Sequence, residues 1–348
     1  MNIQTLEESS TDSESPFYLT KFWFQTLNKY VFSDCTRVNL ISNGLTLAHV
    51  KTKVPFKFLK LNTLKSLTNY YSPDFLPEQF SGPEKSGEIS SFYKEYQQFS
   101  QFDLVDLAPL SELNADSVTT ELNKLGFFCE KYQMSTNWTH PGITSIDDFW
   151  AIRPNRMKNI LKSKKLKLQR DHKYEIKILD EKNIDDFQQM LGHYHDVYNK
   201  SWKNNEPYTN FIDDIALEEH KKGKLRLGIL YYDDVAVAAQ IWFVHHQTAY
   251  IFKLSYDNVY RTESFGTILM EALFNHVIDQ DKVTMVDFLT GDDKYKADWM
   301  TASRPLFGIK AYNKKTLKGF ICTISIKLKN YLQAKTQPEL PADRKSVV

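Results

Sequence analysis

The chain has 348 residues, with 44 basic and 43 acidic side chains, and aromatic residues make up 14% of it. This length is sufficient for two domains, each able to bury a core of its own. The composition is typical of a globular protein and excludes low-complexity and collagen-like chains. No apolar run approaches the roughly 18 residues that a bilayer-spanning helix needs, so we expect no membrane span.

The two ends of the chain and its cysteines carry little structural information. We expect residues 1–16 to be a disordered lead-in, because this acidic, serine-rich stretch lacks the basic and apolar regions of a signal peptide. Residues 333–348 are expected to be a flexible tail. The three cysteines lie far apart and none has a histidine at metal-ligand spacing. This pattern favours a reducing, cytoplasmic location and argues against a metal site.

Residues 17–149 form the expected first domain, in which helices and strands alternate. Apolar residues at helical spacing predict a helix over 17–30, and Asn43-Gly44 between two apolar runs predicts a β-hairpin turn. The other elements expected in this half are strands over 37–41, 45–50, 58–61, 67–75, 104–107 and 127–134, and helices over 86–101 and 117–126.

A strongly basic segment follows the junction between the two halves. From Arg153 to Arg170 it has eight basic residues and no acidic one, and Pro154 suits the start of a helix. Such a helix can attract RNA, a phosphorylated sugar or an acidic polymer. The alternative is a solvated face that packs on the first half, where acidic residues outnumber basic ones.

Residues 150–332 form the expected second domain, with the order hairpin, strand, loop, helix, strand, helix, strand. The strands are expected over 174–179, 225–232, 235–244, 248–256, 283–289 and 306–312. The helices are expected over 183–200, 211–221 and 268–279, around 295–299, and from 314 onward.

The most informative stretch runs from Met285 to Trp299. A β-branched and aromatic strand ends at Thr290-Gly291, and two carboxylates, a tyrosine, a lysine and a tryptophan follow within a few residues. This chemistry is typical of a polar site at the carboxyl edge of a sheet. The alternative is a buried strand followed by a turn and a solvated helix.

A second motif is the loop that opens the helix over 268–279. Ser264-Phe265-Gly266 places a glycine at the start of a helix, where unpaired N–H groups and the helix dipole attract anions. Ser264 and Thr267 can donate hydrogen bonds, and Arg261 supplies a positive charge nearby. The loop therefore predicts a binding site for a pyrophosphate.

Taken together, these motifs resemble the GNAT acyltransferase superfamily, and more closely its CelD/BioF-like branch, which is related in fold to the FemAB peptidyltransferases. The resemblance covers residues 150–312 well and residues 17–149 faintly. Two departures are visible: Phe265 stands where a proline is expected, and the usual Arg/Gln-x-x-Gly-x-Gly/Ala loop is absent. The residues that carry the resemblance are Tyr256-Asp257, Ser264-Phe265-Gly266, Asp287 to Asp292, Tyr295-Lys296, Trp299, Trp202-Lys203, Glu206, Ala238-Ala239-Gln240 and the basic segment from Arg153.

The resemblance implies an α/β protein of mixed sheet, with two GNAT-like domains in tandem of which the first is degenerate. It implies transfer of an acyl group from acyl-CoA, as co-substrate, to an amine or hydroxyl of an amino sugar or a polysaccharide or envelope precursor. One alternative is a FemAB-like transferase that uses aminoacyl-tRNA, although no RNA-binding module accompanies the basic helix. Another is a non-catalytic binding subunit. No permanently bound cofactor is expected, and the sequence does not indicate the oligomeric state.

The resemblance also implies roles for single residues. The acyl thioester is expected between the strands over 248–256 and 283–289, with a free backbone N–H holding the oxyanion. Asp287 or Asp292 is the expected base, Tyr295 the expected acid, and Lys296 a ligand for phosphate or acceptor. The expected donor-binding residues are Tyr256, Arg261, Ser264, Phe265, Gly266 and Thr267. The expected acceptor-binding residues are Trp202, Glu206, Gln240, Gly291, Trp299, Arg153 and Arg156.

Overall fold

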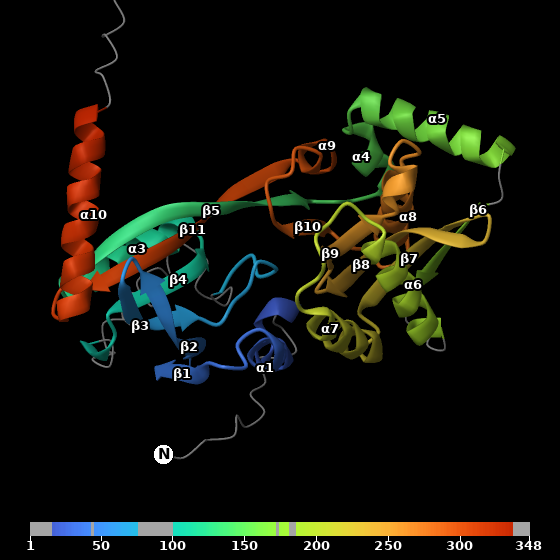
Figure 1. Cartoon of the computed structure of the whole chain (residues 1–348). Helices are drawn as coiled ribbons and strands as arrows, with labels where there is room; N and C mark the ends of the chain where they lie inside the picture. The colour runs from blue at the N-terminus through green and yellow to red at the C-terminus, as the bar shows by residue number, and fades with distance from the viewer. Residues whose placement is uncertain (1–15, 43–44, 76–99, 172–173, 181–185, 337–348) are drawn as a thin grey trace, which may run out of the picture.

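The computed structural model describes residues 16–42, 45–75, 100–171, 174–180 and 186–336. Within these residues, 11 strands join into one mixed sheet in the order β1-β2-β3-β4-β11-β5-β10-β9-β8-β7-β6 (Figure 1). Helices cover parts of both faces. The predicted α/β fold with a mixed sheet is therefore confirmed.

The N-terminal half contains a three-stranded meander and a fourth strand parallel to its last member. Its helix α1 begins at an N-cap, where the Thr20 hydroxyl accepts a hydrogen bond from the N–H of Trp23 at 3.2 Å. The elements are η1 (Phe17–Leu19), α1 (Lys21–Tyr30), β1 (Thr36–Ser42), β2 (Leu45–Phe56), β3 (Leu59–Ser66), β4 (Leu104–Leu110), α3 (Glu112–Lys124) and β5 (Phe127–Pro141).

The C-terminal half repeats this plan, since β7, β8 and β9 form an antiparallel meander and β10 lies parallel to β9. The elements that precede and form this meander are α4 (Ile146–Ala151), α5 (Asn155–Asp171), β6 (Tyr174–Leu179), α6 (Phe187–Asn199), α7 (Thr209–Lys221), β7 (Leu225–Tyr232), β8 (Val235–His245) and β9 (Thr248–Tyr256). Those that follow it are η5 (Asn258–Tyr260), α8 (Phe265–Asp279), β10 (Met285–Thr290), α9 (Lys296–Trp299), β11 (Ala302–Asn313) and α10 (Leu317–Thr336).

The two halves exchange their last strands. β11, from the C-terminal half, pairs with β4, and β5, from the N-terminal half, pairs with β10. The exchanged strands also pair with each other along their length, from Ala302 opposite Thr139 to Asn313 opposite Phe127. Figure 1 shows them crossing the molecule between the two halves. The division at residues 149 and 150 stays a prediction, and the sheet is continuous across it.

A hydrophobic core also joins the halves. Phe17, next to α1, packs edge-on against Phe243, Tyr250 and Phe252 of the C-terminal strands at centroid distances of 4.9 to 5.8 Å. All four rings are buried. The opposite face of the C-terminal strands packs on α8, with Leu269 and Leu273 fully buried. The sheet is therefore covered on both faces where β9 and β10 meet.

Some sequence expectations are wrong or fall outside the described residues. Residues 67–75 form no strand, because β3 ends at Ser66 and the Ser72-Pro73 region continues as turns and bends. The tail expected from Gln333 begins inside α10, which continues to Thr336. The helix over 86–101 lies almost entirely outside the described residues. So do the lead-in, apart from Pro16, and the turn at 43–44. The hairpin itself is confirmed by Ser42 pairing with Leu45.

The strand exchange predicts that the halves unfold together. Ile309 of β11 is fully buried among N-terminal side chains such as Leu107 and Val118. Ile309→Ala is expected to lower the free energy of unfolding by about 2–4 kcal/mol. Ile152→Ala, at a side chain that is 60% exposed, is the matched control and should change it by less than about 0.5 kcal/mol. Denaturant unfolding followed by far-UV circular dichroism and by tryptophan fluorescence should give one coincident, shifted transition. Two separate transitions, with only one shifted, would contradict the coupling.

Candidate functional site

The site forms where two parallel strands separate. β10 pairs with β9 only from Met285 opposite Thr248 to Asp287 opposite Tyr250. Beyond this point β9 continues to Tyr256 along β8, while β10 resumes pairing with β5 on its other side. A gap in the sheet therefore opens between the ends of β9 and β10.

Asp287 stabilises this separation from inside the protein. Its Oδ1 accepts hydrogen bonds from the N–H of Leu289 and from the amide of Asn137, each at 2.6 Å. The same Asn137 amide donates to the carbonyl of Leu289 at 2.9 Å, and Leu289 has a positive φ of 55°. Burial raises the pKa of Asp287, whose side chain is 4% exposed. Asp287, one of the two residues expected as the base, is therefore buried and holds the bend of β10.

Two lysines donate hydrogen bonds to carbonyl groups at the ends of the separated strands. On the β9 side, the Lys203 ammonium donates to the carbonyl of Leu254. On the β10 side, the Lys296 ammonium donates to the carbonyls of Thr290 at 3.0 Å and Gly291 at 3.1 Å. Burial lowers the pKa of both lysines, and that of Lys203 to about 8. Lys296, predicted to bind phosphate or acceptor, instead caps the end of β10.

Two further predicted residues shape the turn after β10. Gly291 has a φ of 122°, and an added Cβ would lie 2.9 Å from the Lys296 ammonium, so the turn requires glycine. Asp292 accepts a hydrogen bond from the indole of Trp138 at 3.0 Å. Neither residue lines the cavity described next, so the geometry gives both a structural part.

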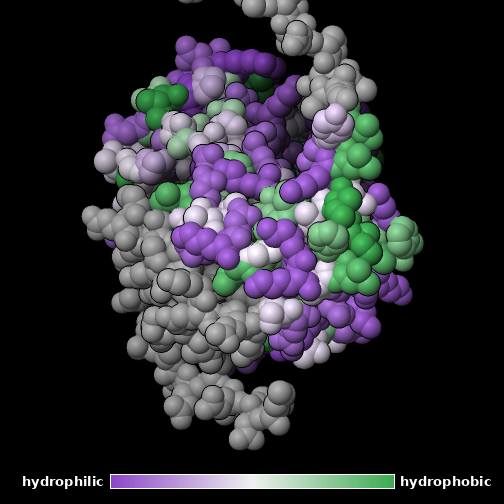
Figure 2. Space-filling view, turned by 90° about the vertical axis from the view of Figure 1, so that its left-hand side faces the viewer, coloured by the Kyte–Doolittle hydropathy of each residue, from purple (hydrophilic) through white to green (hydrophobic). Residues whose placement is uncertain are grey.

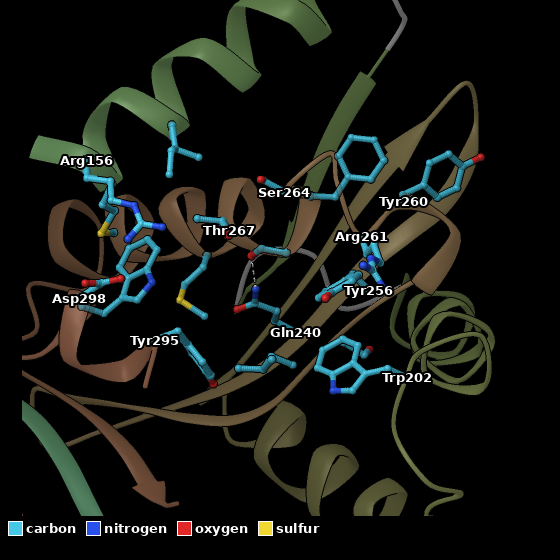
Figure 3. Close-up of a pocket in the computed structure, with 18 of the residues that line it drawn as sticks. Arg156, Trp202, Gln240, Tyr256, Tyr260, Arg261, Ser264, Thr267, Tyr295 and Asp298 are labelled. Atoms are coloured by element: carbon cyan, nitrogen blue, oxygen red, sulfur yellow. Dashed lines mark hydrogen bonds between the residues drawn. The ribbon is translucent and has the colours of Figure 1, made fainter. Parts of the chain in front are cut away.

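A cavity of about 430 Å³ lies at the gap, between the end of β9, the start of α8, α9 and the first turns of α5 (Figure 3). Eleven of the predicted site residues line it: Arg156, Trp202, Gln240, Tyr256, Arg261, Ser264, Phe265, Gly266, Thr267, Tyr295 and Trp299. Figure 3 shows Arg156 and Asp298 at one end of the cavity, and Arg261, Tyr256 and Trp202 at the other. The sequence had assigned these eleven residues to a common site.

The start of α8 is fixed to the sheet and strained. Gln240 donates to the carbonyl of Gly266 at 2.8 Å and accepts from the indole of Trp242 at 2.9 Å. Ser264 adopts the left-handed conformation, with φ of 62°, and its side chain makes no capping hydrogen bond. A left-handed backbone in a residue other than glycine is unfavourable and is concentrated at functional sites.

The turn from Arg261 to Gly266 corrects one of the two departures from the family pattern. Arg261, Ser264 and Gly266 have the spacing of the Arg-x-x-Gly-x-Gly/Ala loop, which was expected to be absent. Ser264 stands where the first glycine is expected, and it adopts the positive φ that glycine favours. The loop is therefore present with one substitution, and the spacing alone would have revealed it.

Aromatic and apolar side chains form the remaining walls. Trp299 stacks on Phe274 with ring centroids 4.8 Å apart, and Trp202 packs over Tyr256 at 4.3 Å. Met157 and Ile160 of α5 add aliphatic surface. Tyr295 is 38% exposed, and burial of its phenol raises its pKa. Trp299 thus belongs to the core and to the cavity wall at once.

The basic helix α5 touches the cavity with one end only. Lys165 pairs with Glu271 at 2.9 Å and Lys167 with Glu263 at 3.0 Å. The alternative that α5 packs on the first half is therefore wrong, because its partners lie on α8 and on the loop before it. Arg153 does not line the cavity: it is buried with its guanidinium 4.0 Å from the Phe149 ring centre, and burial lowers its pKa to about 10.

A second polar cluster, which sequence reasoning missed, lies on the other face of the sheet. Glu206 pairs with the Lys253 ammonium and accepts hydrogen bonds from Tyr71 at 2.9 Å, Tyr70 at 3.4 Å and the N–H of Tyr208 at 3.3 Å. Burial alone raises the pKa of Glu206, but attraction to Lys253 and these hydrogen bonds outweigh it and hold the pKa below its usual range. Glu206 therefore joins the two halves and does not line the cavity where it was expected.

Known proteins share the domain and the fold. A family model described as an acetyltransferase (GNAT) domain matches residues 155–297. The crystal structure of FemX has a TM-score of 0.54 at 11% identity, covering 87% of this chain and 93% of FemX. A conserved protein of unknown function from Bacteroides thetaiotaomicron has a TM-score of 0.50 at 11% identity, covering 87% of this chain and 93% of its own. No curated protein matches the chain.

A third solved structure is the C-terminal domain of a proposed lysylphosphatidylglycerol synthetase from Agrobacterium fabrum. Its TM-score is 0.53 at 8% identity, covering 89% of this chain and 95% of that domain. The chain therefore has a tandem fold similar to that of FemX over most of its length, and residues 155–297 match an acetyltransferase (GNAT) domain.

No helix among the described residues is long and apolar enough to cross a bilayer. Within the same residues, no three His, Cys, Asp or Glu side chains come together as metal ligands.

The placement of Asp287 predicts a structural phenotype for Asp287→Asn. The asparagine keeps an oxygen that accepts from Leu289 and Asn137, so we expect a loss of about 1–2 kcal/mol in unfolding free energy. The transfer rate of the folded variant should stay within about fivefold of the parent, whereas removal of a general base would lower it by about 10²–10⁴. Steady-state rates normalised to folded protein check this, and a hundredfold loss would restore Asp287 to the mechanism.

The Glu206 pair predicts a pH-dependent stability. Glu206→Gln leaves Lys253 buried without its counter-charge and should cost about 3 kcal/mol at neutral pH. Because folding lowers the pKa of Glu206, its contribution is present above the unfolded pKa and is lost as pH falls through the folded pKa. Denaturant unfolding at pH 7 and pH 3 should show the gap between parent and variant closing in acid. The exposed pair Lys29–Asp214 is the control: Asp214→Asn should cost at most about 1 kcal/mol.

Proposed function

We propose that the protein is an acyltransferase that moves an acyl group from acyl-CoA to an amine or hydroxyl acceptor. The proposal rests on the turn from Arg261 to Gly266. This turn begins helix α8 and lines the cavity at the gap between β9 and β10. This combination offers one end for phosphates and another for a thioester. A long donor such as acyl-CoA, which carries phosphates and a thioester at separate places, requires this arrangement.

The phosphate end of the donor would lie at the start of α8. First-turn N–H groups and the positive end of the helix dipole favour a pyrophosphate, and Arg261 adds a full charge. An added Cβ at Gly266 would lie 3.1 Å from the Tyr256 ring, so glycine keeps the first turn close to the strand. Arg156, from α5, supplies a second guanidinium at the far end of the cavity.

The acyl end of the donor would lie at the gap itself. Met157, Ile160, Met270 and Trp299 give this part of the cavity an apolar wall. The acceptor nitrogen or oxygen attacks the thioester carbonyl, the C–S bond breaks, the departing thiolate takes a proton from Tyr295, and the proton that the acceptor loses returns to the Tyr295 phenol through solvent. A backbone N–H at the edge of β9 would hold the oxyanion, and Tyr295 is the proton donor that lines the cavity.

Two features favour a CoA donor over aminoacyl-tRNA. The Arg261-x-x-Ser264-x-Gly266 turn suits a pyrophosphate, and Lys164, Lys165 and Lys167 of α5 are engaged with Glu263 and Glu271. The FemX-like fold keeps the aminoacyl donor as the second candidate. The acceptor class, an amino sugar or a polysaccharide or envelope precursor, remains a proposal from the sequence resemblance.

Binding of CoA to Ser264 variants tests the donor. Ser264→Gly relieves the left-handed strain and should bind acetyl-CoA within about threefold of the parent, because the backbone and not the hydroxyl is proposed to hold the phosphates. Ser264→Val places a β-branched residue in that conformation and should weaken binding roughly tenfold or more. Isothermal titration calorimetry with acetyl-CoA, a longer acyl-CoA and free CoA measures this.

The same titrations separate the alternatives. Binding of no CoA species by the parent would contradict the proposed donor and leave the aminoacyl-tRNA or non-catalytic alternatives. Equal binding by Ser264→Gly and Ser264→Val would remove the turn from the phosphate site. A variant distant from the cavity, Leu113→Ala, is the control and should bind like the parent, since Leu113 is an exposed side chain of α3.

A further inference from the structure

The C-terminal helix α10 presents an apolar stripe to solvent. Leu317, Phe320, Ile324 and Leu328 recur at helical spacing and are 77%, 48%, 51% and 55% exposed. The opposite side of the helix packs on the N-terminal half through buried Cys322 and Ile326. The stripe is therefore a second apolar face that the packing of α10 does not use. Figure 2 looks onto this end of the molecule and shows a vertical band of hydrophobic side chains beside hydrophilic ones.

The turn between β2 and β3 extends this surface. Lys57 donates to the hydroxyl of Ser325 at 3.4 Å, and Lys318 donates to the carbonyl of Lys60 at 2.8 Å, so the turn lies beside α10. Phe58, at the tip of this turn, is 84% exposed and is the most exposed large apolar side chain among the described residues. Two elements thus offer apolar side chains at the same end of the molecule.

The charge of these elements is of one sign. α10 contains Lys318, Lys327, Lys329 and Lys335, and residues 45–66, which span β2, the turn and β3, contain five more lysines; neither α10 nor residues 45–66 contain an acidic residue. This is notable because acidic residues outnumber basic ones in the first 150 residues. Asp103, which interacts with Cys322 on the inner side of α10, is itself buried.

We propose that α10 and the β2–β3 turn dock on an anionic membrane surface, which we call the docking surface of this protein. A basic helix with an apolar stripe lies in the plane of a membrane interface, its apolar face at the acyl boundary and its lysines at acidic headgroups. Pairing with a second copy would bring together two lysine-bearing helices with no acid on either, which disfavours it. The positive charge of these elements therefore favours an anionic membrane surface as the binding partner. The docking surface lies away from the cavity at β9 and β10, so this proposal does not rest on the proposed function.

Vesicle flotation tests the proposal with the full chain. The parent should float with phosphatidylcholine vesicles that contain phosphatidylglycerol, not with pure phosphatidylcholine vesicles, and less at high salt. Phe320→Ser with Leu328→Ser should weaken binding at least tenfold. Lys60→Gln with Lys329→Gln should weaken it roughly tenfold on the anionic vesicles. Val235→Ser, at a half-exposed apolar residue that begins β8, is the matched control and should float like the parent.

Three results would overturn the proposal. They are no flotation of the parent with anionic vesicles, equal flotation with neutral ones, and unchanged flotation of the Phe320→Ser, Leu328→Ser variant. Sedimentation equilibrium of the same proteins tests whether the stripe binds a second copy of the chain instead. A dimer that this variant abolishes, without vesicle binding by the parent, would assign the stripe to self-association. The replaced side chains are exposed, so unchanged unfolding midpoints verify that the variants are folded.

Discussion

The arrangement of the site depends on one break in the sheet, where β10 leaves β9 after Asp287. A continuous parallel pair would leave no opening for a ligand and no unpaired backbone groups at its edge. The break is held by the buried carboxylate of Asp287, which takes the N–H of Leu289 and the amide of Asn137. Lys203 and Lys296 then satisfy carbonyls on the two separated edges. A cavity with a strained helix start on one side follows from these contacts.

The exchange of β5 and β11 ties this break to the rest of the molecule. Asn137, which helps to hold Asp287, lies on β5, a strand of the N-terminal half that pairs with β10. Arg304 of β11 in turn donates to the Asn137 side chain at 2.8 Å. Both exchanged strands therefore support the geometry of the C-terminal site. The geometry of the site in the C-terminal half therefore requires the N-terminal half.

Sequence patterns predicted those features that are local in the chain. The order of strands and helices from 174 to 279, and the loop at Ser264 to Gly266, follow from periodicity and from turn chemistry. The roles given to Asp287, Lys296 and Glu206 did not follow, because residue type shows that a group can ionise but not where its hydrogen bonds go. The Glu206 cluster joins residues far apart in the sequence, such as Tyr71 and Lys253, and the strand exchange has no local signal at all.

The most direct test is a crystal structure of the protein with acetyl-CoA bound. We predict the pyrophosphate within hydrogen-bonding distance of the first-turn N–H groups of α8, and the thioester in the gap between β9 and β10 beside Tyr295. Acetyl-CoA bound on the opposite face, near Glu206 and Lys253, or at a distance from the Arg261 to Gly266 turn, would contradict this prediction.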